Sequence, residues 1–233
     1  MKALILAAGK GERMRPLTDH RPKPLLNVDG KTLLDHQIDK LARAGIREIV
    51  INTSYLGHMV HEHLHNRPRK DIEIYFSDED QPLETGGAIN HALDLLGEAP
   101  FILVNGDVWT ELDYASLIAR YRDQFNVSKN NKHIYGHLVL VPTPDFKIHG
   151  DFSIQEGFLQ PLVKGQGDYT FSGVSILSPQ IISQYPKRRA IFALKEVFDW
   201  AMDTACLSAE VYDGFWLDVG TPERFEFLKE RIG

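Results

Sequence analysis

Short apolar runs alternate with longer amphipathic segments through the first half of the chain. The apolar runs predict β-strands at residues 4–8, 49–52, 72–76 and 101–104. Apolar residues at helical spacing predict helices over residues 33–44, around 60–64 and over 88–96. Strands that alternate with helices are typical of a parallel sheet covered on both faces. The pattern therefore predicts an α/β fold with a doubly wound, mostly parallel mixed sheet flanked by helices.

The second half of the chain is less regular. Residues 123–133 are polar and rich in Asn and Lys, which predicts a mobile surface loop ahead of a strand at 137–141. Shorter strands follow, with a helix near 194–202 and a last helix over 222–231. Because 233 residues suit one large domain, we interpret 1–233 as a single Rossmann-like domain.

The charge and composition of the chain argue against several classes of binding partner. The net charge is −6 with acidic and basic residues interspersed, which argues against a nucleic-acid partner. No apolar stretch approaches the ~18 residues that a membrane-spanning helix needs, and the N-terminus predicts a strand rather than a signal peptide. The single Cys206 excludes an intrachain disulfide and a cysteine zinc cluster. We therefore expect a cytoplasmic protein without a membrane partner, either a monomer or a small homo-oligomer.

A glycine-rich loop follows the first predicted strand. Gly9 and Gly11 lie in a segment that also carries Arg13, and the run Pro22-Lys23-Pro24 comes soon after. Glycines let backbone N–H groups approach a phosphate, and basic side chains neutralise its charge. A dinucleotide-binding loop would need a third glycine where Met14 stands, and a Walker A loop would end in Gly-Lys-Ser/Thr. The sequence therefore predicts a phosphate site of another kind.

Two carboxylates are candidate metal ligands. Asp107 closely follows the apolar run 101–104, so it lies at the carboxyl edge of the predicted sheet, where the glycine loop also begins. The segment 215–222 supplies a second candidate in Asp218, and its Thr221 predicts the N-cap of the last helix. Magnesium is typically held by one or two carboxylates together with substrate phosphates. The two carboxylates therefore predict an Mg²⁺ site.

The two basic segments resemble the signature of the sugar-1-phosphate nucleotidyltransferases, Gly-x-Gly-x-Arg-x-x-Pro-Leu-Thr followed by Pro-Lys-Pro. The resemblance implies a nucleotidyltransferase type A-like fold and an Mg²⁺-dependent reaction. In that reaction the phosphate of a sugar 1-phosphate attacks the α-phosphorus of a nucleoside triphosphate, and pyrophosphate leaves. The resemblance further implies a nucleotide-binding half, 1–122, and a sugar-binding and C-terminal half, 136–233.

The resemblance also implies a role for particular residues. Catalysis is assigned to Arg13, Lys23 and Asp107, and metal binding to Asp107 and Asp218. The implied nucleotide-binding residues are Ala8, Gly9, Gly11, Arg13, Lys23, Gln81 and Gly86. The implied sugar-binding residues are Asn105, Asp151, Ser172 and Gly173, the last near the end of a strand. Because an amide both donates and accepts hydrogen bonds, Gln81 suits uracil, thymine or guanine and does not identify the base.

Within the family, the motifs at 83–87, 104–109 and 171–173 are most similar to the N-acetylmuramate 1-phosphate uridylyltransferases, which make UDP-N-acetylmuramate in peptidoglycan recycling. A mannose-1-phosphate guanylyltransferase is the alternative. A catalytically silent nucleotide-sugar-binding protein is a third interpretation, against which the intact catalytic and metal-binding residues argue. Many relatives carry Val-Glu-Lys-Pro where this chain has residues 161–165, so the Glu is missing and Lys164 is a candidate contact to the sugar phosphate.

Two further clusters have structural as well as functional interpretations. His61 and His65 stand four apart on a predicted helix and can share a metal, but no acidic or cysteine residue stands at metal spacing nearby. We therefore expect a structural or surface role for these histidines. Trp109 and Trp216 each stand close to a candidate metal ligand, where core packing and sugar stacking both fit the sequence.

Overall fold

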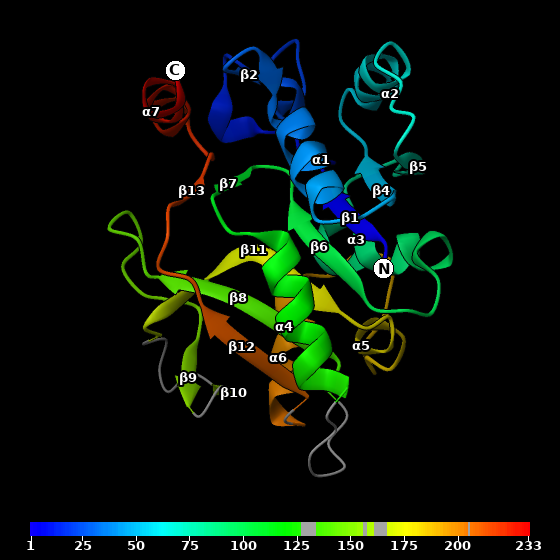
Figure 1. The fold of residues 1–233 in the computed structure, drawn as a ribbon, viewed down its shortest axis with the longest axis vertical. Helices are drawn as coiled ribbons and strands as arrows, with labels where there is room; N and C mark the ends of the chain where they lie inside the picture. Colours follow the sequence, from blue (N-terminus) through cyan, green and yellow to red (C-terminus); the bar gives the residue numbers. More distant parts are fainter. Residues whose placement is uncertain (127–133, 156–157, 161–166, 205) are drawn as a thin grey trace.

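The structure, a computed structural model, describes residues 1–126, 134–155, 158–160, 167–204 and 206–233 (Figure 1). Its helices are α1 (Leu33–Arg43), α2 (Gly57–His65), α3 (Glu84–Leu96), α4 (Tyr114–Asn126), α5 (Gln180–Ser183), α6 (Leu194–Asp203) and α7 (Pro222–Ile232). Two short 3₁₀ turns, η1 (Glu12–Met14) and η2 (Lys23–Leu25), follow the first strand. The strands are β1 (Ala3–Leu6), β2 (Asn27–Val28), β3 (Lys31–Thr32), β4 (Glu48–Thr53), β5 (Glu73–Asp78), β6 (Phe101–Asn105), β7 (Val108–Thr110), β8 (Gly136–Pro142), β9 (Ser153–Gln155), β10 (Phe158–Gln160), β11 (Tyr169–Leu177), β12 (Leu207–Val211) and β13 (Trp216–Asp218).

Nine of the described strands form one mixed sheet in the order β5-β4-β1-β6-β11-β8-β12-β10-β9. The four strands of the first half are parallel to one another. In the second half, β11 and β10 run antiparallel to their neighbours, while β8 and β12 are parallel to each other. The doubly wound, mostly parallel mixed sheet is confirmed. It arises because β1 and β6 are fully apolar over most of their length and are covered on both faces.

Successive residues of the central strands face two different cores. Ala3 and Ile5 of β1 belong to one apolar cluster, and Leu4 belongs to the other. The first cluster is completed by apolar side chains from α1, α2 and α4, and the second by side chains from α3, α5 and α6. Helices therefore cover both faces of the sheet, with α1 and α4 on the same side (Figure 1). In the described part of the chain, no helix is long and apolar enough to cross a membrane.

A small two-stranded ribbon pairs a segment from the middle of the chain with a segment near its C-terminal end, next to the carboxyl edge of the sheet. Strand β13 pairs antiparallel with β7, so that Asp218 stands opposite Val108. Helix α7 then begins at the expected N-cap, Thr221, whose hydroxyl accepts a hydrogen bond from the amide of Arg224. A third apolar cluster packs α7 against the segment that follows the glycine loop. The sequence pattern did not predict this ribbon, which holds the C-terminal segment against the first half of the chain.

Two expectations for the second half of the chain are corrected. The strand expected to end near Gly173 is β11, which continues to Leu177 through a β-bulge between Phe171 and Val174. Gly173 has a φ of 78°, and a Cβ there would lie 2.8 Å from the Asn105 amide nitrogen, so the bulge needs a glycine. The start of the expected loop 123–133 is helical, because α4 runs to Asn126. The rest of that expected loop, 127–133, lies outside the described residues.

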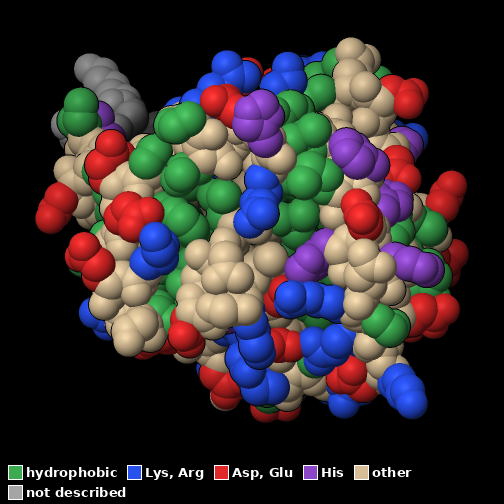
Figure 2. All heavy atoms as spheres, turned by 90° about the horizontal axis from the view of Figure 1, so that it is seen from above, with side chains coloured by type: hydrophobic (Ala, Val, Ile, Leu, Met, Phe, Trp, Pro, Cys, Tyr) green, Lys and Arg blue, Asp and Glu red, His purple; other side chains and the backbone are tan. Residues whose placement is uncertain are grey.

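The histidines of α2 pair with carboxylates from other elements. His61 lies 2.8 Å from a carboxylate oxygen of Asp78, at the end of β5, and His63 lies 3.0 Å from Asp35 of α1. Seen from above, histidines lie among acidic side chains on the side of the molecule where α2 lies (Figure 2). No cluster of three or more metal-binding side chains occurs among the described residues. These pairs connect α2 to its neighbours, in agreement with the structural role expected.

Glu210 of β12 is a carboxylate whose charge stabilises the second half of the sheet. Burial alone would raise its pKa, but hydrogen bonds with His137 and Arg120 hold the pKa of Glu210 at about 2 rather than 4.5. The Arg120 guanidinium contacts it with two nitrogens, at 3.0 Å and 2.5 Å. A carboxylate with a lowered pKa stabilises the folded state fully above its unfolded pKa, and that contribution disappears as the pH falls through the folded pKa.

We expect Glu210→Gln to lower the free energy of unfolding by about 3 kcal/mol near pH 6. The difference from the wild type should shrink as the pH falls from 4.5 towards 2, the two pKa values of Glu210. Urea denaturation of both proteins at a series of pH values measures this difference, in which the other carboxylates cancel. A difference that stays constant over that pH interval would contradict the assignment.

Candidate active site

A cavity of about 760 Å³ opens at the carboxyl ends of β1 and β6. Its location agrees with the rule that ligands of doubly wound sheets bind at this edge. It brings together seven of the residues implied by the sequence: Ala8, Gly9, Gly11, Arg13, Lys23, Asn105 and Asp107. The remaining lining residues are Leu6, Ala7, Lys10, Glu12, Met14, Pro24, Asn52, Glu79, Pro82, Leu83, Glu84, Thr85, Ala88, Gly106 and Gly220.

The glycine loop forms one wall of this cavity. Gly11 adopts a left-handed conformation, with a φ of 64°, immediately before η1. Its carbonyl accepts hydrogen bonds from the Met14 amide and the Thr18 hydroxyl, both at 2.8 Å. Arg13 is exposed in the same turn. The loop is therefore fixed by local hydrogen bonds while its basic side chain stays free to meet an anion.

Lys23 and Asp107 form an ion pair inside the cavity. The Lys23 Nζ lies 2.7 Å from Asp107 Oδ2, with side-chain exposures of 10% and 37%. Lys23 begins η2, whose other residues are buried, so the ammonium group is held at a fixed position in the cavity wall. An ammonium group has three donors. Lys23 can therefore hold the carboxylate and donate to a substrate phosphate at the same time.

Asp218 reaches the neighbourhood of Asp107 through the β7–β13 ribbon. The amide of Val219 donates to the Asp107 carbonyl at 2.9 Å, and Gly220 lines the cavity. The Asp218 carboxylate itself accepts from Arg224 at 3.1 Å. The donor set is thus two carboxylates, the oxygen ligands that hard divalent cations prefer. Asp107 lines the cavity and Asp218 does not, although its neighbour Gly220 does. No group of three or more metal-binding side chains occurs among the described residues, so phosphate and water oxygens would have to complete the shell of a cation held by these two carboxylates.

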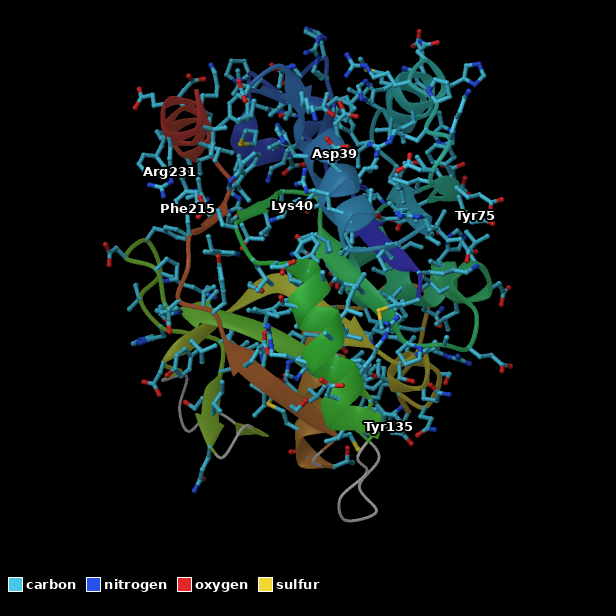
Figure 3. All side chains as sticks on the ribbon, viewed as in Figure 1. Asp39, Lys40, Tyr75, Tyr135, Phe215 and Arg231 are labelled. Carbon is cyan, nitrogen blue, oxygen red and sulfur yellow. The ribbon has the colours of Figure 1, made fainter. Side chains whose placement is uncertain are left out.

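Helix α1 holds the ribbon from the other side. The Gln37 amide donates to the carbonyl of Val108, and Lys40 donates to the carbonyl of Thr110. Burial lowers the pKa of Lys40 to about 8. Figure 3 shows Lys40 on α1, and Phe215 beside Arg231 of α7, whose guanidinium lies 3.9 Å from the ring centroid. Because the Glu111 amide donates to the Phe215 carbonyl, this contact lies at the same end of the ribbon as Thr110. Gln37 and Lys40 therefore fix β7 at its two ends, directly after Asp107.

The residues implied for the sugar lie beyond the cavity, with the exception of Asn105. The Asp151 carboxylate accepts from Lys147 at 2.6 Å and from the amide of Phe171 at 3.3 Å. Ser172 is 2% exposed and its hydroxyl accepts from the amide of Val174. In this structure Asp151 and Ser172 thus support β11, while Gly173 touches Asn105, which does line the cavity.

The two tryptophans contact protein groups. Trp216 donates from its indole nitrogen to the Ser172 carbonyl at 2.8 Å, and Trp109 packs edge-on against His36. Both tryptophans therefore pack against protein groups, as the core-packing interpretation predicts. Lys164, the other candidate for the sugar phosphate, lies outside the described residues.

The segment that precedes α3 contributes a second wall of the cavity, but not through the residues expected. Gln81 is exposed and is not among the lining residues. The amide of Gly86 donates to the Phe192 carbonyl at 2.9 Å, and a Cβ there would lie 2.6 Å from the Phe192 ring. Gly86 therefore allows the start of α3 to pack closely against the segment before α6. The wall itself is formed by the residues from Pro82 to Thr85.

Sequence reasoning missed Asn52 and Glu79, which line the cavity and are 3% and 7% exposed. Asn52 accepts a hydrogen bond from the amide of Ala7 and donates to Glu79. The sequence did contain a signal for both residues, because each is a polar residue at or just after the carboxyl end of a predicted strand. Neither belongs to a glycine-rich motif, which is why the motif analysis passed over them.

The chain matches known proteins over its whole length. Residues 2–137 match the family model for nucleotidyl transferases. The N-acetylmuramate alpha-1-phosphate uridylyltransferase of Neisseria meningitidis serogroup B is 41% identical, over 100% of this chain and 99% of its own length. The mannose-1-phosphate guanyltransferase of Schizosaccharomyces pombe is 32% identical, over 97% of this chain and 62% of its own length.

A solved structure has the same fold. A Bacillus anthracis protein named as a glucose-1-phosphate thymidylyltransferase superposes with a TM-score of 0.84 over 100% of this chain and 95% of its own. Its sequence identity is 21%, so the likeness concerns the fold alone. The nucleotidyltransferase-type fold implied by the glycine loop is confirmed.

Proposed function

The chain belongs to the nucleotidyl transferase family and is a sugar-1-phosphate nucleotidyltransferase, and we propose that it transfers the uridylyl group of UTP to N-acetylmuramate 1-phosphate. The products would be UDP-N-acetylmuramate and pyrophosphate. The observation that carries the proposal is the cavity in which the glycine loop, Arg13, Lys23 and Asp107 meet. The choice of substrates rests on the 41% identity over the full length of a uridylyltransferase of that name. Such an activity fits a cytoplasmic role in the recycling of peptidoglycan sugars.

The reaction needs positioning and charge neutralisation more than proton transfer. A sugar 1-phosphate is already an anion near neutral pH, so its oxygen attacks the α-phosphorus without a general base. Lys23 would donate to the α-phosphate, and Arg13 would neutralise the triphosphate in the transition state. The backbone of Gly9 and Gly11 lets the phosphates approach closely. Each of these groups stabilises charge that develops as pyrophosphate leaves.

We propose Mg²⁺ as the cofactor, held by Asp107 and Asp218 together with phosphate oxygens. When bound, the ion supplies positive charge to the phosphates and orients them. The two carboxylates are now paired with Lys23 and Arg224, at 2.7 Å and 3.1 Å. A cation at the two carboxylates would weaken these pairs and leave more of the Lys23 and Arg224 donors for substrate anions.

The nucleotide would occupy the first half of the chain, 1–122, and the sugar would lie towards the second half, 136–233. The base would then lie between Ala8 and the wall formed by residues 82–85, both of which line the cavity. The sugar would extend past Asn105 towards the bulge at Gly173, whose backbone touches the Asn105 side chain.

A mannose-1-phosphate guanylyltransferase is the second candidate. The observation in its favour is the 32% identity to a guanyltransferase over 97% of this chain. Both candidates use the same mechanism and the same residues, so they differ only in the base and the sugar.

Pyrophosphate release tests the proposal directly. The purified protein is assayed with Mg²⁺ and each of the four nucleoside triphosphates against the 1-phosphates of N-acetylmuramate, mannose, glucose and N-acetylglucosamine. Release with UTP and N-acetylmuramate 1-phosphate is the expected result. Release with GTP and mannose 1-phosphate would replace the substrates but keep the mechanism. A folded protein that binds nucleotide and releases no pyrophosphate with any pair would contradict the enzymatic proposal.

A further inference from the structure

Three hydrogen bonds connect the two walls of the cavity through the side chains of Asn52 and Glu79. The amide of Ala7 donates to Asn52 Oδ1 at 2.6 Å, and Asn52 Nδ2 donates to Glu79 Oε1 at 2.7 Å. The amide of Leu83 donates to Glu79 Oε2 at 3.1 Å. We call this chain of contacts the Asn52–Glu79 bridge. It runs from the end of β1, across the end of β4, to the segment that precedes α3.

The bridge has a fixed direction. A backbone N–H can only donate, so the Ala7 amide requires an oxygen from Asn52, and the amide nitrogen of Asn52 must then face Glu79. Glu79 in turn receives two donors, one on each carboxylate oxygen. A carboxylate is the only side chain of this length that accepts at both positions. Both ends of the bridge are backbone groups, so its geometry sets the distance between two stretches of main chain.

The burial of the Glu79 carboxylate is unfavourable for the stability of the folded protein. It is buried, and among the described residues it makes no ion pair, so neutral donors alone balance its charge. A buried charge without a cationic partner costs stability, and a neutral apolar residue would fill the same space at lower cost. This loss of stability is consistent with a requirement for Asn52 and Glu79 to maintain the shape of the cavity, which both side chains line.

We propose that Asn52 and Glu79 are positioning residues for the nucleoside triphosphate. The bridge fixes the separation between the start of the glycine loop at Ala7 and the opposite wall at Leu83, so that the nucleoside fits between them without reordering either segment. Neither side chain touches the reacting phosphates. This inference rests on the proposed function, in that a nucleoside triphosphate occupies the cavity, and it predicts an effect on nucleotide affinity rather than on the chemical step.

Two single variants and their combination test the bridge. Glu79→Gln retains the shape of the side chain but replaces one acceptor oxygen with an NH₂ donor. Whichever way the two side-chain amides are flipped, two N–H donors then face each other at one of the three contacts. Asn52→Asp places two carboxylates in contact. In the double variant Asn52→Asp/Glu79→Gln every donor again meets an acceptor, with the central hydrogen bond reversed. We expect each single variant to raise the Kd for UTP about tenfold, and the double variant to return to within about threefold of the wild type.

Titration calorimetry with UTP and Mg²⁺, together with steady-state kinetics, gives the readouts. We expect the KM for the nucleotide to follow the Kd, while kcat and the KM for the sugar 1-phosphate change by less than about threefold. Ser208→Ala is the matched control, since it removes a buried side-chain hydrogen bond, 2.8 Å to His137, in the other half of the sheet. That variant should lose thermal stability without any change in the Kd for UTP.

The outcomes separate positioning from mere structural support. Single variants that unfold at lower temperature but bind UTP like the wild type would overturn the proposal. So would a double variant that folds and still binds weakly. If a single variant fails to fold, the comparison of the double variant with the wild type decides. A wild-type protein that binds no nucleoside triphosphate would instead contradict the proposed function itself.

Discussion

Asp107→Asn is expected to lower kcat by about 10² or more while the fold stays intact. The side chain is 37% exposed and lies on the cavity wall, so the core does not depend on it. Its backbone carbonyl still accepts from the Val219 amide in the variant, because that contact does not use the side chain. The change removes one negative charge with almost no change in shape. It therefore tests whether the carboxylate itself is needed for nucleotidyl transfer.

Pyrophosphate release at saturating Mg²⁺ measures this effect, with circular dichroism to check the fold. Asp199→Asn is the matched control, because Asp199 pairs with Lys195 at 2.7 Å on the exposed side of α6. That variant should turn over like the wild type. Turnover of Asp107→Asn at the wild-type rate would remove Asp107 from the catalytic machinery.

Lys23→Ala is expected to lower kcat by a similar factor, about 10² or more, through the loss of a cation at the α-phosphate. Its ammonium is the charge closest to Asp107, at 2.7 Å, and is 10% exposed. Removal leaves the Asp107 carboxylate without its partner, so the cavity becomes more negative as well as less basic. Both changes disfavour a bound triphosphate, and the loss should be larger in kcat/KM than in kcat alone.

Lys31→Ala is the control for this variant, since Lys31 also pairs with an aspartate, Asp39 at 2.6 Å, but on the exposed face of α1. Lys23→Arg adds a sharper comparison. A guanidinium is larger and flatter than an ammonium, so we expect it to fit the buried position poorly and to restore little activity. A Lys23→Ala protein as active as Lys31→Ala would show that the ammonium has no part in the reaction.

Local sequence pattern was sufficient for the parallel half of the fold. Its central strands, β1 and β6, are short, apolar and buried on both faces, while the edge strand β5 is partly exposed. The helices between the strands have one apolar side, so the period of the pattern identifies each element. The glycine loop could be predicted equally well, because a glycine-rich turn directly after a buried strand has few functions other than phosphate binding. These signals are all contained within about twenty consecutive residues, the range over which periodicity and motif arguments operate.

The parts that sequence reasoning missed depend on residues far apart in the chain. The β7–β13 ribbon joins Val108 to Asp218, and three-residue strands carry no periodic signal. The Asn52–Glu79 bridge joins three different strand ends in the same way. Gly86 shows a different limit, because a glycine in the first turn of a helix serves close packing as readily as ligand binding. The contact with Phe192 that distinguishes these uses exists only in the folded chain.

The β7–β13 ribbon also bears on when the enzyme becomes active during its synthesis. The strands that carry the glycine loop, Lys23 and Asp107 are made first, and domains begin to fold from the N-terminal side as the ribosome extends the chain. Asp218 and α7, which packs against the segment after the loop, are made later, and β11 must still insert between β6 and β8. A partly made chain thus has the groups proposed to bind phosphate before it has Asp218, the second proposed metal ligand. Synthesis of the segment that carries Asp218, rather than a separate activation step, would then start turnover.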